Sequence, residues 1–180
     1  MAKNYIGQCI TPRVGSEHIT KVTVPAGGLR AGEVVIADTL DNKIVGNIEV
    51  FSATKPATAN LGSKNVALII NDGFETLEDG RRPEGQPNYY HYEFREGDVA
   101  PAIFLDSHLV FNISADTITD GTAVEVGQFL YAVDGSHKLT AGSAIPEGTA
   151  TGLKVVAKYN TPIGGQFGGG FAPSFICVAQ

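Results

Sequence analysis

The chain has 180 residues, of which 43% are hydrophobic and 18% charged, with 22 glycines, nine prolines, one methionine and no tryptophan. This length suits one domain, and the many turn residues with few residues that favour surface helices argue against a helical bundle. The net charge of −6 argues against a nucleic-acid-binding surface, which would carry clustered lysine and arginine.

The N-terminal residues lack the apolar core of a secretory signal, and no later stretch has the apolar length needed to cross a bilayer. We therefore expect no membrane contact and synthesis in the cytoplasm. In that reducing compartment Cys9 and Cys177 are expected to be two thiols, with a disulfide between them as the less favoured alternative.

Short apolar runs separated by turn residues predict the first strands. Residues 19–24 alternate apolar side chains with threonine and lysine, as a half-buried strand does. After a glycine-rich turn, residues 34–37 and 44–51 are expected to form two further strands. Residues 66–70 are short, apolar and β-branched, which predicts a strand buried on both faces.

A charged stretch and an aromatic stretch occupy the middle of the chain. Residues 74–88 read as a surface loop that contains Arg81 and Arg82. The following strand is expected to place Tyr90, Tyr92 and Phe94 on one side and Tyr89, His91 and Glu93 on the other. Phe94 is expected to lie on the inner wall of a barrel, whereas Tyr89 and His91 would project outward beside the arginines.

Further strands are predicted at residues 99–105, 109–113, 124–133, 153–159 and 175–178. Residues 160–174, with the run Gly164-Gly165-Gln166-Phe167-Gly168-Gly169-Gly170, are expected to form a glycine-rich loop ordered by contact with a partner. The prediction is an all-β fold, a β-barrel or a β-tulip or sandwich, with roughly ten short strands and long loops. Residues 1–180 would form one β domain, with 72–95 as an inserted excursion.

Three segments share a spacing in which a glycine, a polar residue and an apolar residue are followed by a basic or imidazole side chain at position eleven and an aliphatic one at twelve. They begin at Gly32, Gly97 and Gly127. Each is expected to be one hairpin. Internal repetition explains the spacing, and so does coincidence in a glycine-rich β-protein; the sequence leaves both open.

The residues that carry catalysis or bind metals do not occur in recognisable patterns. No Gly-x-Ser-x-Gly motif is present, and the neighbours Ser107-His108 and Ser136-His137 would point to opposite faces of a strand. The histidines have no spacing of a metal site, and the glycine runs lack phosphate-binding and dinucleotide-binding patterns. Asn112-Ile113-Ser114 matches a glycosylation sequon, which has no role without secretion. We expect no catalytic residue, no metal and no cofactor.

Two segments resemble hairpins of tailed-bacteriophage capsid decoration proteins. These are Gly32-Glu33-Val34-Val35 and Gly127-Gln128-Phe129-Leu130-Tyr131, each followed by a turn and a lysine-aliphatic pair. The stretch from Asn65 to Asp98, with Asn71-Asp72-Gly73-Phe74-Glu75 and Gly80-Arg81-Arg82-Pro83-Glu84-Gly85-Gln86-Pro87, is similar to phage head proteins.

The resemblance implies a structural cement protein of the virion. It would bind the major capsid protein on the outer surface of the assembled head, as a monomer or a homotrimer, and stabilise the shell. The expected contact residues, drawn from the charged loop, the aromatic strand and the glycine-rich loop, are Arg81, Arg82, Tyr89, Tyr90, Tyr92 and Phe167.

Two alternatives belong to other classes. In a carbohydrate-binding or receptor-binding β-sandwich of a virion, Tyr89, Tyr90 and Tyr92 would form a platform on which sugars stack. A cupin-type barrel enzyme is the second alternative, which the missing histidine and carboxylate metal set disfavours.

Overall fold

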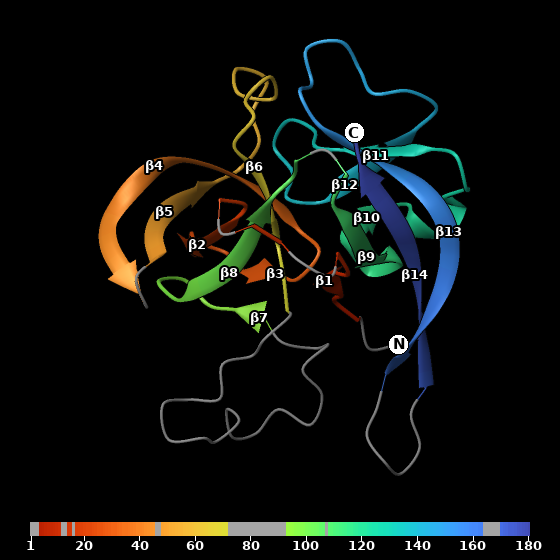
Figure 1. Ribbon diagram of the computed structural model, residues 1–180, viewed down its shortest axis with the longest axis horizontal. Helices are drawn as coiled ribbons and strands as arrows, with labels where there is room; N and C mark the ends of the chain where they lie inside the picture. Colours follow the sequence, from red (N-terminus) through yellow and green to blue (C-terminus); the bar gives the residue numbers. More distant parts are fainter. Residues whose placement is uncertain are drawn as a thin grey trace.

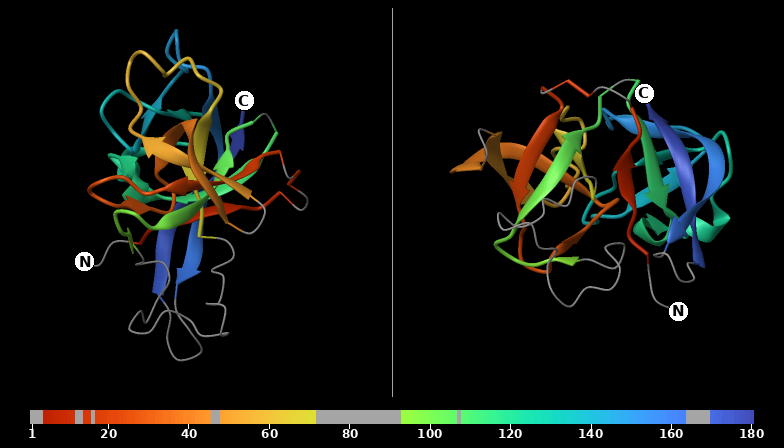
Figure 2. Two further views of the ribbon diagram at one scale, coloured as in Figure 1. Left: turned by 90° about the vertical axis from the view of Figure 1, so that its left-hand side faces the viewer. Right: turned by 60° about the horizontal axis from the view of Figure 1, so that its bottom comes forward.

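The computed structural model describes residues 4–11, 14–15, 17–45, 48–71, 93–106, 108–163 and 170–180. The fold is nearly all-β, with 51% of residues in strands, and the predicted all-β class is confirmed. The strands form a closed barrel and a larger curved sheet that lie side by side (Figure 1). The two further views in Figure 2 show the same arrangement.

The barrel has five strands in the order β2-β5-β4-β6-β8. Their bounds are β2 (Ile19–Thr23), β5 (Ile48–Thr54), β4 (Val34–Val45), β6 (Val66–Ile69) and β8 (Val99–Phe104). The interior of so narrow a barrel has little room, and most of the side chains that fill it are small: alanines from four of its strands and valines, with Ile69 as the larger exception. A two-stranded ribbon of β3 (Leu29–Arg30) and β7 (Glu93–Phe94) adds Leu29 and Phe94 to this core. Phe94 is 7% exposed, so its side chain is buried as predicted, although β7 belongs to this ribbon and not to the wall of the barrel.

The second sheet has seven strands in the order β1-β9-β14-β13-β11-β12-β10. Their bounds are β1 (Gly7–Cys9), β9 (Val110–Ser114), β14 (Gly170–Ala179), β13 (Gly152–Ile163), β11 (Phe129–Tyr131), β12 (Leu139–Gly142) and β10 (Ile118–Thr119). Two 3-10 helices, η2 (Ala115–Thr117) and η3 (Gly121–Ala123), flank β10. The long antiparallel pair β13 and β14 runs along the outer side of the molecule (Figure 1).

One hydrophobic core joins the barrel to the sheet. It includes Leu68 and Ile103 from the barrel and Phe111, Leu130 and Cys177 from the sheet. At the junction, a Cβ on Gly7 would collide with the backbone of Gly32 and Ile69, so only glycine lets β1 lie this close to the barrel. The side chain of Asn71 bonds across the same junction, its Nδ2 donating to the Tyr5 carbonyl at 3.0 Å.

Three turns share one construction. They span residues 30–33, 95–98 and 125–128, and their third residues, Gly32, Gly97 and Gly127, have φ of 89°, 84° and 93°. The N–H of each fourth residue donates to the carbonyl of the first, at 3.1, 3.0 and 3.3 Å. The positive φ at the third residue makes these type II turns, which require glycine there.

The side chain of the fourth residue locks each turn. Glu33, Asp98 and Gln128 accept the backbone N–H of the first residue at 2.9, 2.7 and 2.8 Å. Each turn is also bonded to one residue of a neighbouring segment. The N–H groups of Gly32, Gly97 and Gly127 donate to the carbonyls of Ile69, Val24 and Val155, respectively. The N–H of each of these partners donates to the carbonyl of the residue that follows the glycine. The common spacing in the sequence therefore corresponds to a common turn, bonded in the same way three times.

The prediction that each of these segments is a hairpin is wrong for two of them. After Gly32 the chain continues through Leu40 as the single long strand β4, because a register shift between Leu40 and Lys43 absorbs the residues expected to turn. After Gly97, β8 stays in the barrel and β9 joins the other sheet, with His108 at a φ of 75° between them. Of the three segments, only the one that begins at Gly127 forms the predicted hairpin, from β11 and β12.

The predicted loop at residues 160–174 is also wrong at both ends. β13 extends to Ile163 and β14 begins at Gly170, with Thr161 paired to Ala172 and Ile163 paired to Gly170. Glycine and proline lowered the strand preference of this segment, but Pro162 and Pro173 still lie within the strands. Residues 164–169 lie outside the described residues.

Candidate functional site

The predicted contact residues Arg81, Arg82, Tyr89, Tyr90, Tyr92 and Phe167 all lie outside the described residues, so their role stays a prediction. Glu93 and Phe94 of β7 are the described residues that follow the three tyrosines in the sequence. Glu93 is exposed and Phe94 is buried, which agrees with the alternation expected for this strand.

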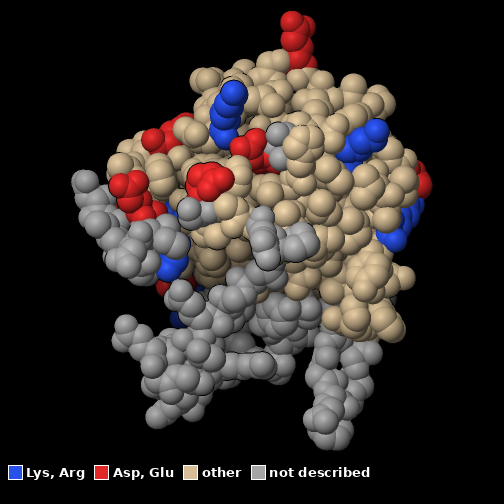
Figure 3. Space-filling view, viewed as in Figure 1, with Lys and Arg blue, Asp and Glu red and all other residues tan. Residues whose placement is uncertain are grey.

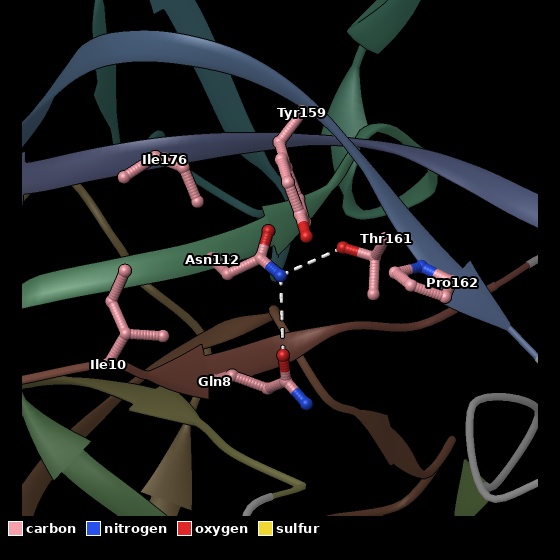
Figure 4. A pocket seen from close by; sticks show the side chains of 7 residues that line it. All are labelled: Gln8, Ile10, Asn112, Tyr159, Thr161, Pro162 and Ile176. Atoms are coloured by element: carbon pink, nitrogen blue, oxygen red, sulfur yellow. Dashed lines mark hydrogen bonds between the residues drawn. The ribbon is translucent and has the colours of Figure 1, made fainter.

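A hollow of about 380 Å³ lies on the face of the seven-stranded sheet that points away from the shared core. It is lined by Gln8, Ile10, Asn112, Tyr159, Thr161, Pro162 and Ile176 (Figure 4). The strand register explains why these residues meet. Gln8, Asn112 and Ile176 are direct partners across β1, β9 and β14 and share one face, whereas the neighbouring row through Phe111 and Cys177 points into the core.

A chain of hydrogen bonds runs through the floor of this hollow. Asn112 Nδ2 donates to Gln8 Oε1 at 3.2 Å and to Thr161 Oγ1 at 2.8 Å. The Thr161 hydroxyl is 2.8 Å from that of Ser174, which itself donates to the Tyr159 carbonyl at 3.3 Å. Because Ser174 uses its proton there, Thr161 donates to Ser174.

The rim of the hollow is apolar and exposed. Tyr159 is 49% exposed and Ile10 is 47% exposed, and the lining residues carry no charge. Tyr159 also borders a second hollow of about 350 Å³, next to Lys158 and η3. There the Lys158 ammonium pairs with Glu125 at 2.8 Å.

Charged side chains elsewhere mainly join segments of the chain. Arg30 Nε bonds Glu93 Oε1 at 2.6 Å, Nη1 lies 3.4 Å from Glu33 Oε1, and the guanidinium lies 5.1 Å from the centre of the Tyr5 ring. The hydrogen bond to Glu93 raises the pKa of Arg30, while burial raises the pKa of Tyr5. Figure 3 shows acidic side chains scattered over the barrel side of the molecule and a mostly uncharged surface over the rest of that face.

The side chains considered for chemistry have other partners. His137 Nδ1 donates to the Val34 carbonyl at 2.9 Å, and Ser136 Oγ bonds the backbone of Lys138, so these two neighbours do not form a catalytic pair. Burial raises the pKa of Cys177 to about 12, so its thiol stays protonated near neutral pH. Within the described ranges, no group of three or more His, Cys, Asp or Glu side chains could hold a metal ion.

Cys9 and Cys177 are not joined by a disulfide, as expected. Both are register partners of Phe111, one on each side of β9. They are therefore two strand spacings apart, about 10 Å, which exceeds the Cα separation that a disulfide spans.

A scan against protein-family models and searches of curated proteins and of solved structures found no match to this chain. In the described part of the chain, no helix has the length and apolar character needed to cross a membrane.

Sequence reasoning did not single out this hollow. The sequence analysis identified Asn112 only as part of a glycosylation sequon, and it did not predict Gln8 or Tyr159 as site residues. One signal was available, because Asn112 interrupts the otherwise apolar run Val110-Phe111-Asn112-Ile113. An amide within such a run needs hydrogen-bond partners, and the neighbouring strands supply them for its nitrogen.

Proposed function

We propose that this protein is a structural capsid decoration protein, which binds the outer surface of an assembled phage head through the major capsid protein and stabilises the shell. The observation that carries the proposal is the turn common to the two segments that resemble such proteins, although only the segment at Gly127 continues as a hairpin. The segments at Gly32 and Gly127 start from the same type II turn, with the same side-chain lock and the same bonds to a neighbouring segment.

The bonding of the ionisable side chains also supports a structural role. Glu33 and Asp98 hold turns, and Arg30 joins β3 to β7. These side chains stabilise the backbone of a body whose two sheets share one core. A rigid body of this kind suits a protein that must resist deformation of the surface on which it sits.

The proposed contact surface is the charged loop and the aromatic strand. Tyr89 and His91 lie outside the described residues, and the alternation predicted from the sequence would place them on the side of Glu93, which is exposed. Tyrosine and arginine are the side chains that most often dominate binding energy in interfaces, which favours Tyr89 and Arg82 as central contacts.

A double variant of Tyr89 and Arg82 to alanine tests this surface. If both are central contacts, attachment to empty capsid shells weakens by about 1–3 kcal/mol in a co-sedimentation assay, while the midpoint of thermal unfolding stays nearly unchanged. Phe94→Ala is the matched control, because removing this buried side chain should lower the free energy of unfolding by about 3–5 kcal/mol. Co-sedimentation of the double variant equal to that of the parent would place the contact surface elsewhere.

A further inference from the structure

One buried polar atom on the face of the seven-stranded sheet has no partner. Asn112 is 4% exposed, and its Oδ1 accepts no hydrogen bond, although its Nδ2 makes two. Buried polar atoms nearly always have a partner, since leaving one unsatisfied costs about 1–3 kcal/mol. Asn112 lines the hollow, but its oxygen has almost no solvent-accessible surface, so a donor that enters from solvent reaches this oxygen only if lining side chains shift.

The geometry of the hollow limits what that donor can be. Figure 4 shows the Asn112 oxygen pointing to the side on which Tyr159 lies, while its nitrogen faces Gln8 and Thr161. The lining has no charged side chain to balance an ionic ligand. Its volume of about 380 Å³ lies near the lower end of the range for small-molecule sites, roughly 300–1,000 Å³.

The surfaces around Asn112 match the two kinds of surface that a sugar ring presents. Tyr159 offers a half-exposed aromatic side chain, and Ile10 and Ile176 offer aliphatic ones, for the C–H face of the ring. The carboxamide of Asn112 and the hydroxyl of Tyr159 lie at the same hollow for the ring hydroxyls, each of which donates and accepts.

We propose that this hollow is a binding site for one neutral sugar unit, with a ring hydroxyl donating to Asn112 Oδ1 and the ring packing against Tyr159. None of the residues that line the hollow belongs to the predicted aromatic strand. It does not depend on attachment to a capsid, so either proposal can fail without the other.

The test is a titration of the full chain, labelled with ¹⁵N, with the methyl glycosides of glucose, galactose, mannose and N-acetylglucosamine. At least one of them should shift the side-chain amide resonances of Asn112 and Gln8 in a saturable way, while glucuronate should bind at least tenfold more weakly because nothing in the lining balances its charge. N-acetylglycine methylamide serves as the probe for a peptide ligand.

Variants locate the binding. Tyr159→Ala should weaken glycoside binding about tenfold through loss of the ring contact, and Tyr159→Phe less, because the ring remains. Val156→Ala is the matched control, since Val156 lies on the same strand, is 45% exposed and does not line the hollow. Asn112→Leu should abolish the saturable shifts at Gln8, with circular dichroism used to confirm that the variant is folded.

Four outcomes would overturn the proposal. These are shifts with none of the glycosides, shifts confined to residues away from the hollow, binding that Tyr159→Ala and Val156→Ala affect equally, and shifts at Asn112 with the peptide probe alone. The last would assign the hollow to a peptide.

Discussion

At the scale of single residues, the three glycine turns share one backbone geometry, but replacing the glycine should lower stability by different amounts. Gly32, Gly97 and Gly127 all need positive φ, but only Gly32 is crowded. A Cβ there would lie 2.6 Å from the Ile6 carbonyl oxygen and 2.7 Å from Thr117 Oγ1, whereas a Cβ at the other two would meet nothing within 4 Å. Backbone strain and steric overlap can therefore be separated in one protein.

Gly127→Ala is expected to lower the free energy of unfolding by about 1–2 kcal/mol, the cost of a left-handed conformation for a side chain with a Cβ. Gly32→Ala should cost about 1–3 kcal/mol more, because overpacking is added to the same strain. Urea denaturation of the two variants measures the difference. Equal losses would show that the surroundings of Gly32 yield without cost.

Cys177 makes stability depend on pH above the neutral range. Burial raises its folded pKa to about 12, while an unfolded thiol has a pKa of about 8.5. The folded state keeps its proton where the unfolded state loses it, so the contribution is complete below about pH 8.5 and declines as pH rises toward 12. By pH 10 the loss should be about 2 kcal/mol.

Cys177→Ala removes this pH-dependent contribution of the thiol and lowers stability at every pH through lost packing. Its deficit relative to the parent should therefore shrink by about 2 kcal/mol between pH 7.5 and pH 10, as measured by urea denaturation. Val155→Ala removes a buried neighbour in register with Cys177 and no titratable group, so its deficit should stay constant. A constant deficit for Cys177→Ala as well would contradict the account.

At the scale of elements, the sequence predicted strands best where apolar residues alternate or cluster. The expected strands at 19–24, 66–70 and 99–105 agree with β2, β6 and β8 to within about one residue, and β6 is fully buried as predicted. The expected strand at 124–133 is reduced to β11, because its first part forms the type II turn. Strands of two or three residues, such as β3 and β10, are too short to show a period.

The outer part of the β13 and β14 ribbon depends on tertiary bonds that no local pattern encodes. Thr161 accepts a bond from Asn112 of β9 and shares one with Ser174 of β14. Thr161→Val keeps the shape but leaves both partners short of a bond, so stability should fall by about 1–3 kcal/mol.

Hydrogen exchange should show faster opening of β13 near this position in the Thr161→Val variant. Thr122→Val, at an exposed position, is the control and should change neither stability nor exchange. Unchanged exchange in β13 of the Thr161 variant would contradict the assigned role of this hydroxyl.

At the scale of the whole molecule, the core shared by the barrel and the sheet predicts that the two unfold as one cooperative unit. Phe111 from the sheet is fully buried in a cluster with Leu68 and Ile103 from the barrel. Phe111→Ala should cost about 3–5 kcal/mol and leave a single unfolding transition, measured by calorimetry. Phe171→Ala, at a 68% exposed position, should change stability by less than about 0.5 kcal/mol. Two resolved transitions in the Phe111 variant would mean that the two parts unfold separately.

Hydrophobic patterning predicted the fold class, because alternation and turn residues report directly on strands. It did not predict the pairing order, since the division into a closed barrel and a separate sheet depends on contacts far apart in the chain, such as β1 with β9. For the same reason it did not predict the hollow, whose residues Gln8, Asn112 and Tyr159 come from three distant segments.

Binding to capsid shells tests the proposed function most directly. Purified protein should be titrated against empty shells assembled from the proposed partner, the major capsid protein, and the bound copies counted by quantitative gel analysis. We predict saturation at a fixed simple ratio of this chain to the capsid protein, with a rise in the temperature at which the shells disrupt. Binding that does not saturate, or saturated shells that disrupt at an unchanged temperature, would contradict the proposal that this protein is a capsid-stabilising decoration protein.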